Sequence, residues 1–252
     1  MAADSPANAA PLLPQWGNVT PFAISNAAAY VPSGPPALNS DQWTTAYNEV
    51  KTLGAVNSST RTADQTQIAM FWADGGGTFT PPGHWNAIAN QQIIAHKMTL
   101  TQSARLLAEL NLGLADAAIV AWKTKYAYDT WRPITAIQQV TAAVNPNVTA
   151  DPNWTPLLTT PNFPEYISGH STFSATAAQI LTSAFGANVA FTTTSPGLTG
   201  VKRSFSSFQA AAAEAGISRV YGGIHFEFAN QDGLATGKKI GDAIVQAFAS
   251  KP

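Results

Sequence analysis

The sequence predicts an all-α protein, a helical bundle with an extended N-terminal arm. Long stretches carry apolar residues at every third or fourth position and begin with helix-start signals, which is the pattern of amphipathic helices. The first forty residues are rich in proline, and only residues 189–194 resemble a strand. Helices that each bury one apolar face pack most simply against one another, so a bundle is expected.

Residues 1–40 hold seven of the 17 prolines and almost no charge. Proline favours extended and turn conformations, so we interpret this segment as an arm, anchored on the core by Trp16, Phe22 and Tyr30. Residues 41–252 are expected to form the helical domain. The start lacks the charged and apolar regions of a signal peptide. It fits a native start or a methionine placed on a processed end, and the latter favours a secreted or periplasmic location over a cytoplasmic one.

Four helices are expected before residue 130. Ser40 caps a helix over 41–53, a second spans 62–72, and Pro82 opens a third over 82–97. Thr101 is expected to cap a long fourth helix with a continuous apolar stripe. The stripe contains Leu106, Leu107, Leu110, Leu114, Ala117, Ala118 and Val120.

The second half of the chain begins with a short helix over 133–140, started by Pro133. Residues 141–166 hold five prolines and show no periodicity. Long loops of this kind are usually functional. Three further helices are expected over 171–184, 206–218 and 227–249.

The composition excludes several classes of protein. Charged residues make up only 11% of the 252 residues and the net charge is -1, so the basic patch that nucleic acid requires is not expected. The chain has no cysteine, which excludes disulfides and thiolate chemistry. No apolar run reaches the roughly 18 residues of a membrane span.

Three separated fragments concentrate the rare basic residues. They are residues 125–133 (K-Y-A-Y-D-T-W-R-P), 166–171 (Y-I-S-G-H-S) and 218–225 (S-R-V-Y-G-G-I-H). Together they contain two of the five arginines and two of the four histidines. So much basic functionality beside glycines indicates a site that holds an oxyanion.

In the first fragment, Arg132 precedes Pro133 and is therefore expected at the turn into a helix. There its guanidinium can bind an oxyanion in two places, while Lys125 supplies a point charge. Taken alone, the fragment also fits two surface cations beside a helix break.

In the second fragment, Ser168 and Gly169 lead into a helix with His170 in its first turn. Backbone amides at a helix start attract anions, and histidine suits proton transfer near neutral pH. In the third fragment, a double glycine lets Arg219 and His225 aim at one point. Singly, these fragments also fit a capped helix and a buried histidine bonded to a carbonyl.

In this order, the fragments resemble the vanadium-dependent haloperoxidases and the related type 2 phosphatidic acid phosphatase (PAP2) superfamily. That pattern is a lysine, six residues, Arg-Pro; then Ser-Gly-His; then Ser-Arg, five residues, His. The resemblance covers roughly residues 40–250, and F-W-A-D-G-G-G-T (71–78) and P-P-G-H-W-N (81–86) are similar to stretches of bacterial members.

The resemblance implies a role for each residue of the pattern. His225 would be the axial ligand to vanadium, or the nucleophile of a phosphatase, and His170 the acid–base residue. Trp122 and Phe163 are similar to aromatic residues that line the halide side of the pocket. Vanadate, or phosphate in the same site, would be held by Lys125, Arg132, Ser168, Gly169, Arg219 and His225.

The sequence departs from the family pattern at two positions. Ile167 stands where a proline usually precedes Ser-Gly-His. Ala229 stands four residues after His225, where the family often has an aspartate that orients the histidine. Glu227, Asn230, Asp232 or a carbonyl are candidates to replace that partner. We expect the loss to harm a nucleophile more than an axial ligand, which favours vanadate.

The resemblance thus implies a vanadate-dependent haloperoxidase that oxidises halide with hydrogen peroxide to a hypohalous-acid equivalent. The first alternative is an acid phosphatase that acts on phosphate monoesters through a phosphohistidine. The second is an inactive homologue that binds oxyanions. A chain of 252 residues is short beside the larger haloperoxidases. We therefore also consider a homodimer in which a second copy completes the pocket wall.

Overall fold

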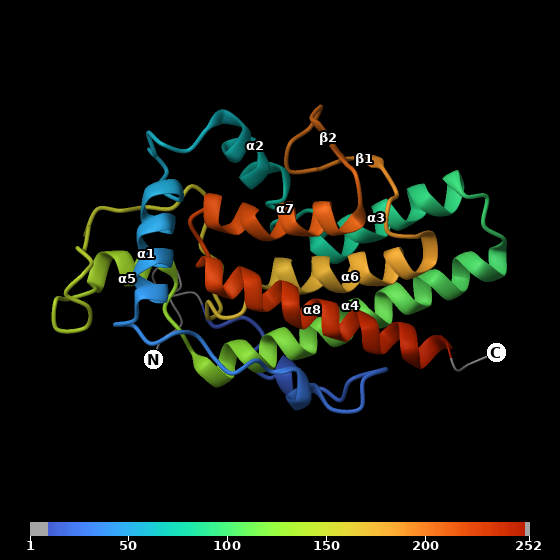
Figure 1. The fold of residues 1–252 in the computed structure, drawn as a ribbon, viewed down its shortest axis with the longest axis horizontal. Coiled ribbons are helices and arrows are strands. Elements are labelled where there is room, and N and C mark those ends of the chain that lie inside the picture. Colours follow the sequence, from blue (N-terminus) through green and yellow to red (C-terminus); the bar gives the residue numbers. More distant parts are fainter. Residues whose placement is uncertain (1–9, 250–252) are drawn as a thin grey trace.

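The computed structural model describes residues 10–249, which form a bundle of α-helices with one small antiparallel sheet (Figure 1). This confirms the all-α prediction. The first helices are α1 (Asp41–Leu53), α2 (Ala63–Phe71), α3 (Thr80–Ala95) and α4 (Leu100–Tyr128). They are followed by α5 (Pro133–Gln139), α6 (Gly169–Phe185), α7 (Phe208–Tyr221) and α8 (Glu227–Ala249), and the sheet pairs β1 (Phe191–Thr194) with β2 (Lys202–Phe205).

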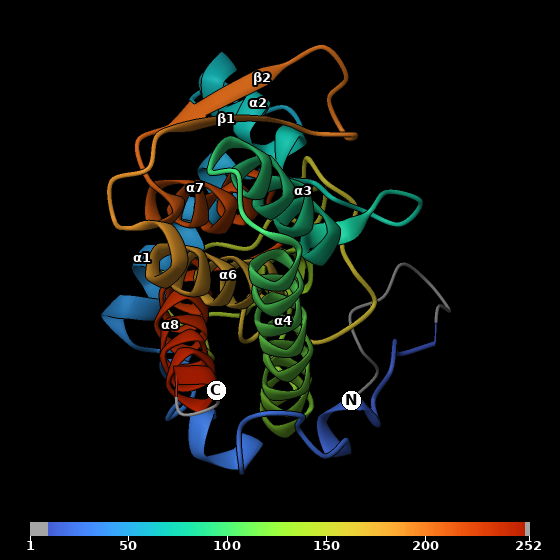
Figure 2. The same ribbon diagram turned by 90° about the vertical axis from the view of Figure 1, so that its right-hand side faces the viewer.

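Helix α6 is the centre of the bundle. Figure 2 shows it surrounded by α3, α4, α7 and α8. Small residues (Ala, Ser, Thr and Gly) fill most of its length, and its side chains are buried along both halves of the helix. Because such side chains project little, the neighbouring helices approach closely on every side.

The contact between α6 and α8 depends on three glycines of α8. Gly233, Gly237 and Gly241 are spaced four residues apart and therefore lie on one face of the helix. A Cβ atom at Gly237 would lie 2.2 Å from the carbonyl oxygen of Thr172 on α6. Side chains at this face are excluded by the backbone of the central helix.

Gly237→Ala is therefore expected to lower the free energy of unfolding by about 2 kcal/mol, because the backbones of α6 and α8 must separate to admit a methyl group. Thermal or urea denaturation followed by circular dichroism measures this effect. Gly75→Ala is the matched control, because a Cβ there meets nothing within 4 Å. Equal stability of the two variants would contradict the close packing.

Three elements begin or pair differently from the sequence-based predictions. The long helix is capped by Thr99, not Thr101, because Thr99 and Gln102 form a reciprocal capping box. Helix α3 starts at Thr80, so both prolines lie in its first turn. Strand β2 was not predicted. It pairs with the segment that does resemble a strand, in the register Phe191 to Phe205.

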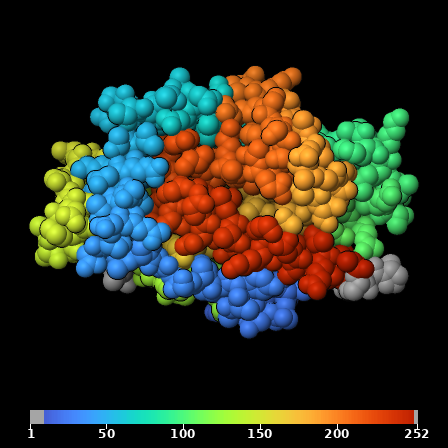
Figure 3. All heavy atoms as spheres, in the orientation of Figure 1, coloured from blue at the N-terminus to red at the C-terminus, as the bar shows by residue number. Residues whose placement is uncertain are grey.

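The segment before α1 lies along the lower edge of the molecule, below the red surface of α8 (Figure 3). Trp16 and Tyr30 pack against the core as predicted, whereas residues 1–9 of the predicted arm lie outside the described residues. Phe22 was wrongly predicted as an anchor, since its side chain is 63% exposed. Its backbone N–H instead donates to the buried carboxylate of Asp116 on α4, as do those of Ala23 and Ile24.

Five helix ends meet at one end of the bundle. These are the last turn of α4, the first turns of α5, α6 and α8, and the last turn of α7, which lie toward the left of Figure 1. A second apolar cluster, built around Trp43, Tyr166 and Phe226, packs behind this junction. Within residues 10–249, no helix has the length and hydropathy to cross a membrane.

Candidate active site

The first basic fragment occupies the turn between α4 and α5. Lys125 lies in the last turn of α4, which ends at Asp129 in a left-handed conformation with φ of 44°. Arg132 is the N-cap of α5 and is extended (φ -68°, ψ 156°). This is the conformation expected for the residue before Pro133. The break thus turns the guanidinium of Arg132 back toward the end of α4.

The second fragment forms the start of α6. Ser168 is its N-cap, and the Ser168 hydroxyl oxygen accepts a hydrogen bond from the backbone N–H of Ser171 at 3.3 Å. Gly169 is the first helical residue, and His170 follows in the first turn. The positive end of the dipole of this 17-residue helix therefore lies beside Ser168, Gly169 and His170.

The third fragment is the turn between α7 and α8. Gly223 adopts φ of 76°, which favours glycine, and a Cβ there would lie 2.4 Å from the carbonyl oxygen of Gly54. The tight turn places His225 just before α8 and Arg219 in the last turn of α7. Both side chains are buried.

The two histidines and the cations of the three fragments lie close together. Burial lowers the pKa of His225 well below its ordinary value, and the charges of Arg132, Lys125 and Arg219 lower it further. Burial and the charges of Arg219 and Lys125 also lower the pKa of His170 well below its ordinary value, opposed by hydrogen bonds to the backbone of residues 72 and 73. The imidazoles are therefore neutral at neutral pH.

The orientation of His225 is fixed by a carboxylate that sequence reasoning missed. His225 Nδ1 lies 2.8 Å from Glu165 Oε1, and His225 Nε2 lies 3.0 Å from the guanidinium NH1 of Arg132. Since the carboxylate accepts from Nδ1–H and the guanidinium donates, Nε2 carries the lone pair. The nitrogen that faces the cations is thus the unprotonated one.

The partners suggested for His225 from sequence make other contacts. Glu227 accepts hydrogen bonds from Asn230 and Gln231, and Asp232 accepts from the Tyr166 hydroxyl. Asn230 accepts from Ser171. Glu165 replaces the carboxylate absent at position 229 from a different segment, 60 residues before the histidine.

Glu165 is fully buried, and its Oε1 also accepts a hydrogen bond from the backbone N–H of Phe226 at 3.0 Å. Burial raises its pKa to about 7, although Arg132, the Phe226 N–H and Lys125 oppose the rise. One signal in the sequence could have identified it. Glu165 is one of only two acids, with Asp151, in the loop over residues 141–166, and it stands five residues before His170.

Lys125 contributes its charge but not its hydrogens to the junction. Its Nζ donates to the carbonyl oxygens of Pro164 and Glu165, both at 3.0 Å, and of Ile167 at 2.5 Å. An ammonium has three N–H donors, so all are used. Burial and Arg132 lower the pKa of Lys125 well below its ordinary value. The lysine ties α4 to the loop that carries Glu165.

The two predicted aromatic residues adjoin the cations. The rings of Trp122 and Phe163 lie 5.0 Å apart. Lys125 Nζ and the guanidinium carbon of Arg132 each lie 5.0 Å from the Phe163 ring centre. Phe163 therefore forms one wall of the junction and attracts both cations through its ring face.

The donor set fits an oxyanion such as vanadate or phosphate. Among residues 10–249, the few buried side-chain atoms without a hydrogen-bond partner include Arg219 Nε and His170 Nε2. Burial lowers the pKa of Arg219 to about 9, so it stays charged at neutral pH. Three buried basic side chains, Lys125, Arg132 and Arg219, face two buried carboxylates, Glu165 and Asp74. A bound anion would balance the remaining positive charge. In the same part of the chain, no group of three or more His, Asp or Glu side chains could hold a metal cation.

The segment from Trp72 to Asp74 completes the surroundings of Arg219. The Trp72 carbonyl oxygen accepts from its guanidinium NH1 at 3.0 Å, and the Asp74 carboxylate raises its pKa against the effect of burial. His84 on α3 lies 3.0 Å from Asp74 and is stacked on the Trp72 ring. The contact with His84 helps to hold Asp74 beside Arg219.

A family model described as the second helical-bundle domain of VCPO matches residues 105–251, more than half of the chain. The chain belongs to the vanadium haloperoxidase family. The curated vanadium chloroperoxidase of Curvularia inaequalis is 28% identical over 176 residues, which are 58% of this chain and 28% of that protein.

Solved structures of this family share the fold. The first bacterial vanadium-dependent iodoperoxidase superposes with a TM-score of 0.86 at 33% identity, over 98% of this chain and 60% of that one. A holo-type bacterial vanadium-dependent chloroperoxidase superposes with a TM-score of 0.74 at 20% identity, over 94% of this chain and 54% of that one. The chain thus spans less than two thirds of the length of these relatives.

Proposed function

We propose that this chain is a vanadate-dependent haloperoxidase that oxidises halide with hydrogen peroxide. The observation that carries the proposal is the unprotonated Nε2 of His225, held by Glu165 among three buried cations. The family of the chain supports the same function, since its relatives are named vanadium-dependent iodoperoxidase and chloroperoxidase.

In this proposal, Arg132, Arg219 and the backbone at the start of α6 would hold the oxyanion, and His225 Nε2 would supply a nitrogen ligand to it. Lys125 stabilises the anion by charge. When bound, vanadate supplies Lewis-acid activation of the peroxide without a change in its own oxidation state. Glu165 keeps the Nδ1 proton of His225 in place, so that Nε2 keeps its lone pair, which accepts from Arg132 NH1 in this structure and would bind the oxyanion in its place.

His170 is the proposed proton carrier. The net reaction consumes hydrogen peroxide, one halide ion and one proton, and gives hypohalous acid and water. The neutral imidazole of His170 has an unpartnered Nε2 that can accept a proton and return it. Phe163 and Trp122 keep water from the site, which strengthens the effect of the charges on the reacting atoms.

A phosphatase remains the second candidate, and one observation favours it. The absence of a carboxylate at position 229 argued against a histidine nucleophile, but Glu165 supplies that carboxylate. With a phosphate monoester, His225 Nε2 would form the bond to phosphorus while the P–O bond to the alcohol breaks. His170, after taking up a proton from solvent, would protonate the departing alkoxide, and water would then cleave the P–N bond to release phosphate and free His225.

One paired assay tests the proposal. The purified chain is loaded with orthovanadate and given peroxide with iodide, bromide or chloride, and halogenation of a dione is followed. A parallel sample without vanadate receives p-nitrophenyl phosphate. We expect halogenation that requires vanadate and slow or no phosphate release. Phosphate release without halogenation would establish the phosphatase instead. Tight vanadate binding with neither activity would identify an inactive oxyanion-binding homologue.

A further inference from the structure

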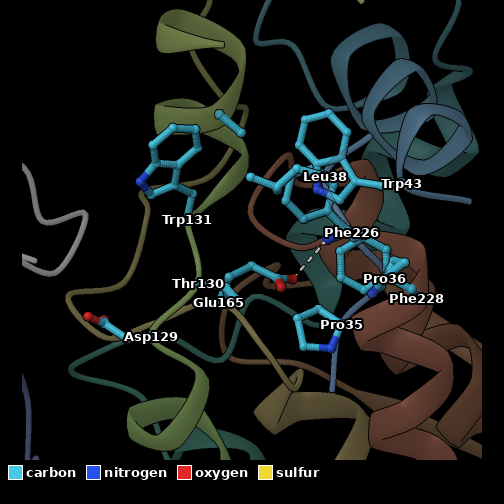
Figure 4. A pocket seen from close by; sticks show the side chains of 12 residues that line it. Pro35, Pro36, Leu38, Trp43, Asp129, Thr130, Trp131, Glu165, Phe226 and Phe228 are labelled. Carbon is cyan, nitrogen blue, oxygen red and sulfur yellow. Dashed lines mark hydrogen bonds between the residues drawn. The ribbon is translucent and has the colours of Figure 1, made fainter. Parts of the chain in front are cut away.

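A pocket of about 290 Å³ lies beside Glu165, and His225 is not among its lining residues (Figure 4). Nine of its twelve lining residues are apolar, and four of these are aromatic. The lining comes from the segment before α1, helix α1, the α4–α5 turn, helix α5, the loop before α6 and the start of α8. It includes Pro35, Pro36, Leu38, Trp43, Trp131 and Phe226. Leu38 is 43% exposed, so the pocket reaches the surface.

Glu165, one of the lining residues of this pocket, carries an unused hydrogen-bond acceptor. Glu165 lines the pocket, and its Oε1 is engaged by His225 Nδ1 and the Phe226 N–H. Its Oε2 is buried and has no hydrogen-bond partner within the part of the chain that is described. Figure 4 shows the carboxylate extending among the rings toward Pro36 and Phe226. A buried acceptor without a partner costs free energy, which a ligand with one donor would recover.

We propose that this pocket binds a small aromatic alcohol, with its hydroxyl hydrogen-bonded to Glu165 Oε2 and its ring between Trp43, Trp131 and Phe226. The volume is sufficient, since a cavity of about 150 Å³ already holds benzene. Aromatic walls favour a flat ring, which packs against them by stacking and edge contacts. One unpartnered acceptor in a mostly apolar lining matches a ligand with a single polar group.

A hydroxyl fits this acceptor better than an ammonium group does. Lys125 and Arg132 already place positive charge beside Glu165, so a further cation would be repelled. A hydroxyl adds no charge. It can also donate a hydrogen bond to a carboxylate oxygen.

The test is titration of 4-fluorophenol with the purified full chain at pH 7, followed by ¹⁹F NMR. No vanadate, peroxide or halide is needed, so the result is independent of the proposed function. We expect a saturable shift with a dissociation constant below the millimolar range. Fluorobenzene, which lacks the hydroxyl, should bind at least about 10-fold more weakly.

Trp131→Ala locates the bound ring. It should weaken 4-fluorophenol binding at least about 5-fold, because it removes one aromatic wall. Phe22→Ala is the matched control, since Phe22 is an exposed aromatic residue outside the lining, and binding should be unchanged. The proposal is wrong if no saturable shift occurs, if fluorobenzene binds equally well, or if Trp131→Ala binds like the unmodified chain.

Discussion

His225→Ala is expected to lower halide oxidation by on the order of 10³-fold and to weaken vanadate binding in parallel. The side chain provides the one imidazole nitrogen that is both unprotonated and directed at Arg132. Alanine removes this ligand, so the imidazole nitrogen beside Arg132 is no longer there to bind vanadate. Turnover with orthovanadate measures the first effect, and equilibrium dialysis of vanadate measures the second without reference to activity.

His96→Ala is the matched control for this variant. His96 is exposed at the end of α3, where its Nδ1 contacts the Gln92 carbonyl oxygen. Its replacement should change neither turnover nor vanadate affinity. Circular dichroism shows whether His225→Ala remains folded, since it leaves the Glu165 carboxylate without its imidazole partner. A folded His225→Ala variant with full activity would refute the assignment of the axial ligand.

Glu165→Gln is expected to weaken vanadate binding and turnover about 10- to 100-fold, the range found for groups that orient a metal ligand. Glutamine keeps the size of the side chain but removes the charge that holds the Nδ1 proton of His225. Glu227→Gln is the matched control, because Glu227 bonds only to Asn230 and Gln231 among the contacts described for it. Equal losses in the two variants would exclude a specific role for Glu165.

The same variant is expected to change how stability depends on pH. The pKa of Glu165 is about 7 in the folded protein against an ordinary value of 4.5. A raised pKa contributes stability that is fully present below pH 4.5 and is lost as pH rises through 7. The difference amounts to about 3 kcal/mol. Urea denaturation at pH 4.5 and pH 8 should therefore show a smaller loss of stability for Glu165→Gln than for the unmodified chain.

Local signals in the sequence predicted most of the helices. Ser40 caps α1 as predicted, and Arg132 is extended because Pro133 follows it. Thr62, predicted as the first residue of the second helix, is the N-cap of α2. Each of these features depends on residues within four positions of one another. The start of α4 was misplaced because Thr99 and Thr101 are both plausible caps. Only the Thr99 hydroxyl has a glutamine three residues later to complete the box.

Contacts between distant segments were not predictable in the same way. The three basic fragments were expected to lie close together because, in their order along the chain, they resemble the family pattern. The pairing of His225 with Glu165 joins a loop to the start of α8, and no local spacing encodes it. The carbonyl acceptors of Lys125 depend on the path of the loop over residues 164–167. Carbonyl acceptors belong to the main chain, so the identity of the side chains does not reveal them.

The carboxylate of Asp116 has a consequence for how the N-terminal segment can vary. It accepts hydrogen bonds from three successive backbone N–H groups, those of Phe22, Ala23 and Ile24. Every amino acid except proline has this backbone N–H, so the contact depends on the main chain and not on the side chains at these positions. Related proteins could therefore keep this segment bound to α4 with unrelated residues at positions 22 and 23. An aspartate in the helix that corresponds to α4 would be the residue to search for.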